Sequence, residues 1–427
     1  MGDEILLKKE IYYLKIFLSI TVLLDALNGF ITMYLPGILE ELVPLIRLGA
    51  IMLFIYLIFK VNKEYFRYVV AVGVLWIINI LIRCLLNENL NIASLFIEVV
   101  YVSRIFYFFS LLLLFISLSN KKLIDLNWMK DIVKRNAYFI VSLILLPTIL
   151  GLGRQTYAGS GFGNSGFFIA NNSTNIVLIV CSLFLLYLYL FEKKQDKVLL
   201  SFFIMSIIAL WVQGSKTSLF FVIVGLLLFI SILIRDNFSK IKKLKNTTII
   251  MTSVFFFIFI FLFNNQLFSF GKEAFETINQ LIIRQKHLAS LNEGIFNVLL
   301  SGRLTFLSDV IGTLSGKSIF FYIIGFGTSN LPAGAIVEMD IIDLLIREGL
   351  LGLLVTYGVS TYCIINNYMK KNEYTNFTIF SNIILFIMIG YSIFAGHVYI
   401  DIMSSSFMAF FLFLSLKSSN DIEEILV

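Results

Sequence analysis

The sequence predicts an all-α protein of the polytopic membrane class, with about 12 transmembrane helices and one long extracytoplasmic loop. Hydrophobic residues make up 59% of the 427 residues and charged residues only 14%, whereas soluble domains average about 25% charged residues. The mean hydropathy is +0.92, and long apolar runs recur along the whole chain. This composition excludes an isolated soluble enzyme, a disordered chain and a disulfide scaffold.

Apolar runs of transmembrane length define the helices in chain order. The predicted spans are 11–30, 44–61, 65–86, 93–118, 137–153, 172–191, 198–212, 217–234, 247–263, 341–365, 376–394 and 400–417. Residues 264–340 form the long loop, in which helical apolar spacing predicts surface-lying helices at 273–291 and 303–315. We expect a single membrane domain over residues 1–427.

The positive charges predict the orientation of the bundle. The chain has 33 Lys and Arg against 27 Asp and Glu, a net charge of +6. One set of loops and the N-terminal tail hold many of these Lys and Arg residues, whereas the alternate loops 31–43, 87–92 and 395–399 hold none. By the positive-inside rule, both termini are cytoplasmic and the protein lies in the cell membrane. In such a protein the positive charge is an orientation signal and predicts no nucleic-acid partner.

Ionisable residues inside predicted spans are costly and often functional. They are Lys15, Asp25, Arg47, Arg83, Glu98, Arg104, Arg347 and Glu348. For Lys15, Arg47 and Arg83 we favour snorkelling to the headgroups. Arg104 is mid-helix, and both a functional role and a structural ion pair remain open for it. Asp340, Asp343 and Arg347 share one helix face by their spacing.

Few Lys and Arg residues lie on the predicted extracytoplasmic side, so each of them is informative about a possible anionic ligand. Arg154 and Arg303 follow glycines in tight local contexts, and arginine is suited to bidentate binding of phosphate. The aromatic residues of the loop 154–171 either stack on sugars or form an interfacial belt; they are Tyr157, Phe162, Phe167 and Phe168. No nucleotide-binding loop or metalloprotease motif occurs, which leaves an ATP-driven pump or a zinc enzyme without support. Glu338 and Asp340 form a lone acidic E-x-D pattern, a weak signal for a divalent cation.

Several short motifs follow one another in order along residues 150–427. They are GFGNSGFFIANN at 161–172, GSKTS at 214–218, SGR at 301–303, GFG at 325–327, EMDIID at 338–343, EGLLG at 348–352 and GH at 396–397. In order and topology the chain resembles the Wzy-type polysaccharide polymerases of the O-antigen ligase/polymerase family, closest to capsule or exopolysaccharide polymerases. Ligase-like members have a histidine before the acidic helix start, where this chain has Glu338 or Asp340, which favours polymerase over ligase.

The resemblance implies a glycosyltransferase that polymerises undecaprenyl-pyrophosphate-linked oligosaccharide repeat units at the outer face of the membrane, with flippase and chain-length regulator proteins as candidate partners. Breaking a sugar–phosphate bond develops negative charge on the leaving group, which cationic side chains stabilise. We assign this role to Arg154 and Arg303, with Lys216 and Arg284 as further candidates. The acceptor hydroxyl needs a base, and the candidates are Glu338, Asp340 and His397. Because a phosphate-linked donor is already activated, the resemblance implies no cofactor and no obligatory metal. Alternative functions are a lipid-linked oligosaccharide flippase or transporter and an O-antigen-type ligase.

Overall fold

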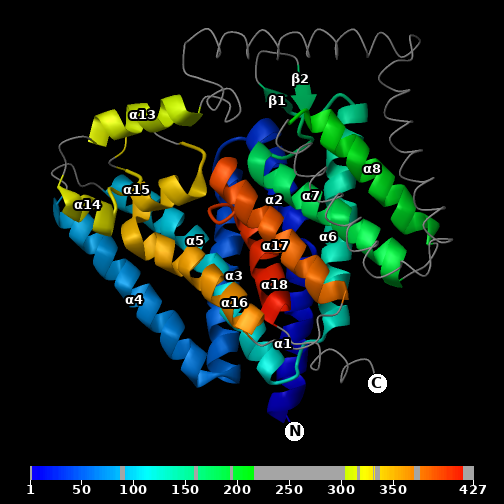
Figure 1. Cartoon of the computed structure of the whole chain (residues 1–427), viewed down its shortest axis with the longest axis horizontal. Coiled ribbons are helices and arrows are strands. Elements are labelled where there is room, and N and C mark those ends of the chain that lie inside the picture. The colour runs from blue at the N-terminus through cyan, green and yellow to red at the C-terminus, as the bar shows by residue number, and fades with distance from the viewer. Residues whose placement is uncertain are drawn as a thin grey trace.

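The computed structural model is helical apart from one short two-stranded hairpin among the residues it describes (Figure 1). The described residues are 2–86, 92–157, 162–192, 196–215, 303–314, 318–329, 331, 337–369 and 376–416. The helices in the first half are α1 (Gly2–Ser19), α2 (Thr21–Tyr34), α3 (Leu42–Val61), α4 (Lys63–Leu86), α5 (Ile92–Asn120), α6 (Leu126–Ile149), α7 (Asn171–Tyr187) and α8 (Lys197–Gln213). Those in the second half are α13 (Arg303–Leu314), α14 (Ile319–Ile324), α15 (Asp340–Leu353), α16 (Val359–Met369), α17 (Asn376–Phe394) and α18 (Ile402–Leu416).

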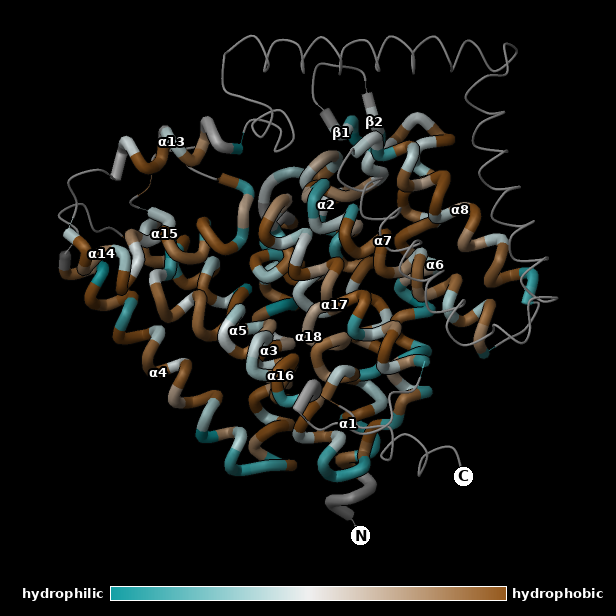
Figure 2. The backbone as a smooth tube through the Cα atoms, viewed as in Figure 1, coloured by the Kyte–Doolittle hydropathy of each residue, from teal (hydrophilic) through white to brown (hydrophobic). Residues whose placement is uncertain are grey.

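The protein is a helical membrane protein, as the composition predicts. Six helices of the described part are long and apolar enough to cross a membrane, and α1 with α2 adds a seventh span if this pair, bent by 52°, is counted as one. Hydrophobic residues run along the length of α4, whereas its first turn is hydrophilic (Figure 2). The remaining predicted spans coincide with shorter or interrupted helices, except 217–234 and 247–263, which lie outside the described residues. The total of 12 spans therefore stays a prediction.

The long loop 264–340 is described only in its second half. The helix predicted at 303–315 is present as α13, and the helix predicted at 273–291 lies outside the described residues. One face of α13 packs through Leu307 and Val310 against a small apolar cluster with Phe326 and Ile346. The other face exposes Phe306.

The bundle has two chemically different ends. At one end lie the hairpin of β1 (Gln155–Tyr157) and β2 (Phe162–Asn164), helix α13 and the start of α15; we call this the hairpin end (Figure 1). The start of α1 lies at the opposite end (Figure 1). That end also holds many basic residues at helix ends and turns, and we call it the basic end; they include Lys60, Lys63, Lys121, Lys122, Lys130 and Lys134.

Several polar side chains in the bundle form hydrogen bonds within it, which satisfies these groups in an apolar surrounding. Ser117 and Ser182 donate to the carbonyls four residues earlier in their own helices. The side chain of Asn136 in α6 donates to Leu18 and accepts from the backbone N–H of Val22, which ties α6 to the α1–α2 bend. Because these bonds cross the bend, they stabilise its geometry.

A break in α15 shapes the hairpin end. Gly349 has φ 65° and ψ −155° within the helix, a conformation that glycine adopts readily and other residues do not. The break removes the helical partners of the preceding carbonyls, which a neighbouring segment replaces. Phe326 N–H donates to Ile346 at 2.7 Å and Gly327 N–H to Arg347 at 3.0 Å.

Candidate functional site

A cavity of about 300 Å³ lies at the hairpin end between α5, α15 and the segment 395–401 that precedes α18. Its apolar wall comes mainly from the first half of α5. Polar side chains line the rest of the cavity. The lining residues are Phe96, Ile97, Val100, Tyr101, Arg104, Thr328, Asp343, Arg347, His397 and Ile400.

Two guanidinium groups give the cavity a positive wall. Arg347 lies over the ring of Tyr101 at 5.2 Å, which fixes the guanidinium by a cation–π contact. Arg104 is exposed at the cavity, and it forms no ion pair with any residue of the described ranges. Among the described residues, Asp343 is the single carboxylate of the lining. The cavity can therefore bind an anionic group next to an apolar one.

Asp343 is held at the start of α15 by backbone donors. Its carboxylate accepts from Val337 N–H at 3.0 Å and from Met339 N–H at 3.3 Å. A carboxylate near a helix N-terminus is stabilised by free N–H groups and by the helix dipole. This arrangement turns the chain into α15 and accounts for the acidic residue without a ligand.

His397 reaches the cavity from a tightly fixed loop. Its φ is 65°, which is uncommon for a residue with a side chain. Asp340, which is fully buried, accepts hydrogen bonds from the backbone N–H groups of His397, Val398 and Tyr399. Ser404 Oγ donates to the carbonyl of His397 at 2.6 Å. The loop is thus held on both sides, with His397 at the cavity.

Glu338 lies directly beside this loop. A Cβ atom on Gly396, whose φ is +67°, would come within 2.6 Å of the Glu338 carbonyl oxygen. Glu338 itself has φ 59°. Its carboxylate, with the side chain 46% exposed, is 3.0 Å from Arg303 Nη2 and accepts from Asn172 Nδ2 at 3.4 Å. The start of α13, the start of α7 and the turn before α15 therefore meet at this carboxylate.

The structure brings together the three residues predicted as candidate bases, although only His397 lines the cavity. Of the predicted anion-binding residues, Arg303 joins this group through Glu338. Arg154 lies apart, exposed at the start of the hairpin, where its guanidinium donates to the carbonyl of Ile169 at 3.1 Å. Lys216 and Arg284 lie outside the described residues.

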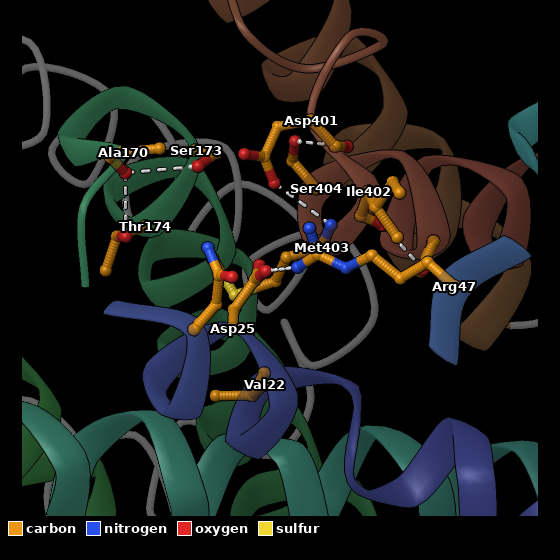
Figure 3. Close-up of polar contacts among 12 residues, drawn as sticks. Val22, Asp25, Arg47, Ala170, Ser173, Thr174, Asp401, Ile402, Met403 and Ser404 are labelled. Atoms are coloured by element: carbon orange, nitrogen blue, oxygen red, sulfur yellow. Dashed lines mark hydrogen bonds and ion pairs between the residues drawn. The ribbon is translucent and has the colours of Figure 1, made fainter. Parts of the chain in front are cut away.

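The snorkelling interpretation is wrong for Arg47 and Arg83. Arg47 forms an ion pair with Asp25, and Asp401 lies close enough to interact electrostatically with the same guanidinium (Figure 3). The side chains of Arg47 and Asp25 are only 15% and 13% exposed. Arg83 is paired within the bundle as well, with its side chain 2% exposed. An arginine that forms an ion pair with a carboxylate inside the bundle does not need to extend to the lipid headgroups.

Lys15, the third residue predicted to snorkel, is paired with Asp131 at 3.2 Å between α1 and α6. The pair lies toward the basic end, and the side chains of Lys15 and Asp131 are 21% and 43% exposed. Partial exposure is compatible with an ammonium group near the interface.

The aromatic residues of the predicted loop 154–171 include a core residue. Phe168 is 1% exposed, which excludes it from stacking on a sugar. Phe167 packs edge-on against Phe30 of α2 with ring centroids 5.3 Å apart. These two rings anchor the hairpin to the bundle.

Arg104 and Arg347 are the cavity residues that sequence reasoning did not assign to anion binding. Their signal was present, because both are arginines within apolar spans and Arg347 shares a helix face with Asp343. The comparisons with known proteins give no further assignment: no family model, no curated protein and no solved structure matches this chain.

Proposed function

We propose that the protein is a membrane glycosyltransferase that polymerises undecaprenyl-pyrophosphate-linked oligosaccharide repeat units into a surface polysaccharide. The supporting observation is the cavity, in which Arg104 and Arg347 lie beside an apolar wall of α5. A pyrophosphate requires cationic donors, and its polyprenyl chain requires an apolar surface. Undecaprenyl pyrophosphate meets both requirements.

The expected orientation agrees with this function. Basic residues at the basic end favour a cytoplasmic position for that end by the positive-inside rule. The hairpin end, with the cavity, then faces the outside of the cell membrane, where lipid-linked repeat units are polymerised. Both termini are cytoplasmic in this arrangement.

In the proposed reaction, the hydroxyl oxygen of an incoming repeat unit attacks the anomeric carbon of the growing chain. A new glycosidic C–O bond forms, and the bond between the anomeric carbon and the pyrophosphate oxygen breaks. The bonding electrons leave on undecaprenyl pyrophosphate, whose added charge is stabilised by Arg104 and Arg347. The hydroxyl proton passes to a base.

His397 is the base that the geometry favours, since it is the one candidate base among the described residues that line the cavity. Both oxygens of the buried Asp340 already accept backbone N–H bonds, which favours a positioning role over proton transfer. Glu338, half-exposed and paired with Arg303, is the second candidate base. In this assignment Arg303 orients Glu338, and Arg154 binds pyrophosphate only if the hairpin approaches the cavity.

The test is a gel of lipid-linked glycans made by the purified protein in liposomes from its cognate repeat unit, taken from the host's own lipid extract. Parent protein should give a ladder of increasing length. Arg104→Gln should lower the rate by about 10²–10³, the usual effect of removing a charge-stabilising donor. Arg67→Gln, an exposed arginine near the basic end of α4, is the matched control and should leave the ladder unchanged.

Two other outcomes would replace this proposal. If no ladder forms and the repeat unit instead reaches the opposite leaflet, the protein is a flippase. If single chains pass to a different acceptor without growing, it is a ligase. A ladder that Arg104→Gln leaves intact would show that the cavity is not the donor site.

A further inference from the structure

One arginine and two glutamates meet outside the cavity, between α4, α5 and α15. Arg83 Nη2 is 3.0 Å from Glu348 Oε2 and 3.4 Å from Glu98 Oε2. The three side chains are between 0% and 4% exposed. None of them lines the cavity. We call Arg83, Glu98 and Glu348 the buried triad.

The buried triad holds the broken part of α15. Arg83 Nη1 donates to the carbonyl of Arg347, which also accepts from Gly327 N–H at 3.0 Å. Arg83 Nη2 binds the carboxylate of the next residue, Glu348. The backbone of Arg347 is therefore fixed from behind by one guanidinium, while its own guanidinium lies at the cavity.

Glu98 holds the neighbouring segment 325–329. Its Oε1 accepts from both the backbone N–H and the hydroxyl of Ser329, at 2.7 and 2.8 Å. A Cβ atom on Gly327 would come within 2.7 Å of the same oxygen, so the segment passes tightly over the carboxylate. Thr328, between these two contacts, lines the cavity.

We propose that the buried triad consists of positioning residues, which set the places of Arg347 and Thr328 in the cavity wall without touching its ligand. The bidentate geometry of Arg83 is the essential feature, because one guanidinium joins a backbone carbonyl to two carboxylates from different helices. Loss of Glu98 frees the segment 325–329 at Ser329, whereas loss of Arg83 frees both the segment and the break in α15. The inference rests on the proposed function only for the identity of the ligand.

The test uses thiol accessibility, which does not depend on polymerisation. The full-length protein is prepared with Thr328→Cys in a Cys84→Ala background, since Cys181 and Cys363 are buried. The reaction rate with a small methanethiosulfonate reagent then reports how firmly the segment 325–329 is held. Undecaprenyl pyrophosphate is added to ask whether it protects the thiol.

Two substitutions of similar size separate positioning from charge. Glu98→Gln keeps an oxygen that can accept from Ser329, and the labelling rate should stay near that of the parent. Glu98→Leu removes the acceptor of two hydrogen bonds to a charged group, and labelling should become at least about tenfold faster. Arg83→Lys, which keeps the charge but not the bidentate geometry, should behave like Glu98→Leu.

The possible results have distinct meanings. If all three variants label at the parent rate and only the melting temperature falls, the buried triad is a stability element and the inference is overturned. Faster labelling in Glu98→Leu with restoration in Glu98→Gln supports it. If this pattern appears but undecaprenyl pyrophosphate never protects the thiol in the parent, positioning holds and the proposed ligand is wrong.

Discussion

The carboxylate of Asp340 holds the backbone of His397, a residue 57 positions later in the chain. The same carboxylate accepts from Val398 N–H at 2.7 Å and from Tyr399 N–H at 3.0 Å. Three consecutive N–H groups that converge on one buried carboxylate form a rigid loop. The acidic start of α15 thereby determines where the imidazole lies.

Asp340→Asn should weaken this loop and misplace His397. An amide has one acceptor oxygen in place of two, so part of the three-donor arrangement is lost, at a cost of about 1.5–3 kcal/mol per hydrogen bond to a charged group. Misplacement of a reacting group lowers the rate by about 10²-fold. The rate at which the glycan ladder grows measures the loss of activity, and thermal unfolding in detergent measures the loss of stability.

Asp125→Asn is the control for that substitution. Asp125 caps α6 at the basic end by accepting from Trp128 N–H, and asparagine caps helices about equally well. Both stability and ladder rate should be unchanged in it. Unchanged ladder kinetics in Asp340→Asn would mean that the carboxylate is not needed to place His397.

Gly396→Ala should disturb the contact between the His397 loop and the turn before α15. The new Cβ atom would lie 2.6 Å from the carbonyl oxygen of Glu338, in a residue with φ +67°. The left-handed conformation alone costs about 1–2 kcal/mol, and the clash adds to it. We expect a lower melting temperature together with a lower ladder rate.

Gly312→Ala in α13 is the comparison, because a Cβ atom there meets nothing within 4 Å. In a helix this exchange stabilises by up to about 1 kcal/mol. If both alanine variants behave alike, close packing at Gly396 is not what holds the loop.

Local features of the sequence predict the helical membrane class, because each apolar run has to match the membrane thickness by itself. Spacing alone also places Asp340, Asp343 and Arg347 on one face of a helix. The partners of the buried charges cannot be predicted from such local features. Arg83 lies 265 positions from Glu348, and nothing near Arg83 in the sequence indicates this pair, so snorkelling was the natural interpretation.

The same limit explains the anion-binding assignments. Loop arginines such as Arg154 stand out in a region with few bases, whereas Arg104 and Arg347 are embedded in apolar runs. Which arginines face the cavity depends on the packing of α5 against α15 and the segment 395–401. That packing is a property of the tertiary structure, and the break at Gly349 that shapes it has no periodic signature.

The ion pair of Asp25 and Arg47 should be important for stability. Removal of one partner from a buried pair costs about 3–5 kcal/mol, because the other charge is left uncompensated. Arg47→Leu should therefore unfold at a much lower temperature than the parent in detergent. The double variant Asp25→Leu with Arg47→Leu should recover part of the loss. A double variant no more stable than Arg47→Leu would show that the unpaired charge of Asp25 is not the source of the loss.

The orientation predicts which side of the membrane each end faces. Lys9, near the basic end, and Gln155, in the hairpin, are exposed and are separated by α2 to α6. In a Cys84→Ala background, a membrane-impermeant maleimide should label Gln155→Cys in intact cells. It should label Lys9→Cys only after permeabilisation, because the positive-inside rule keeps the basic end cytoplasmic.

The reverse pattern would place the cavity on the cytoplasmic side, where polymerisation at the outer face is impossible. Labelling of both from the same side would instead mean that the number of spans between them is even, so one of the helices α1 to α6 would not cross the membrane as assigned.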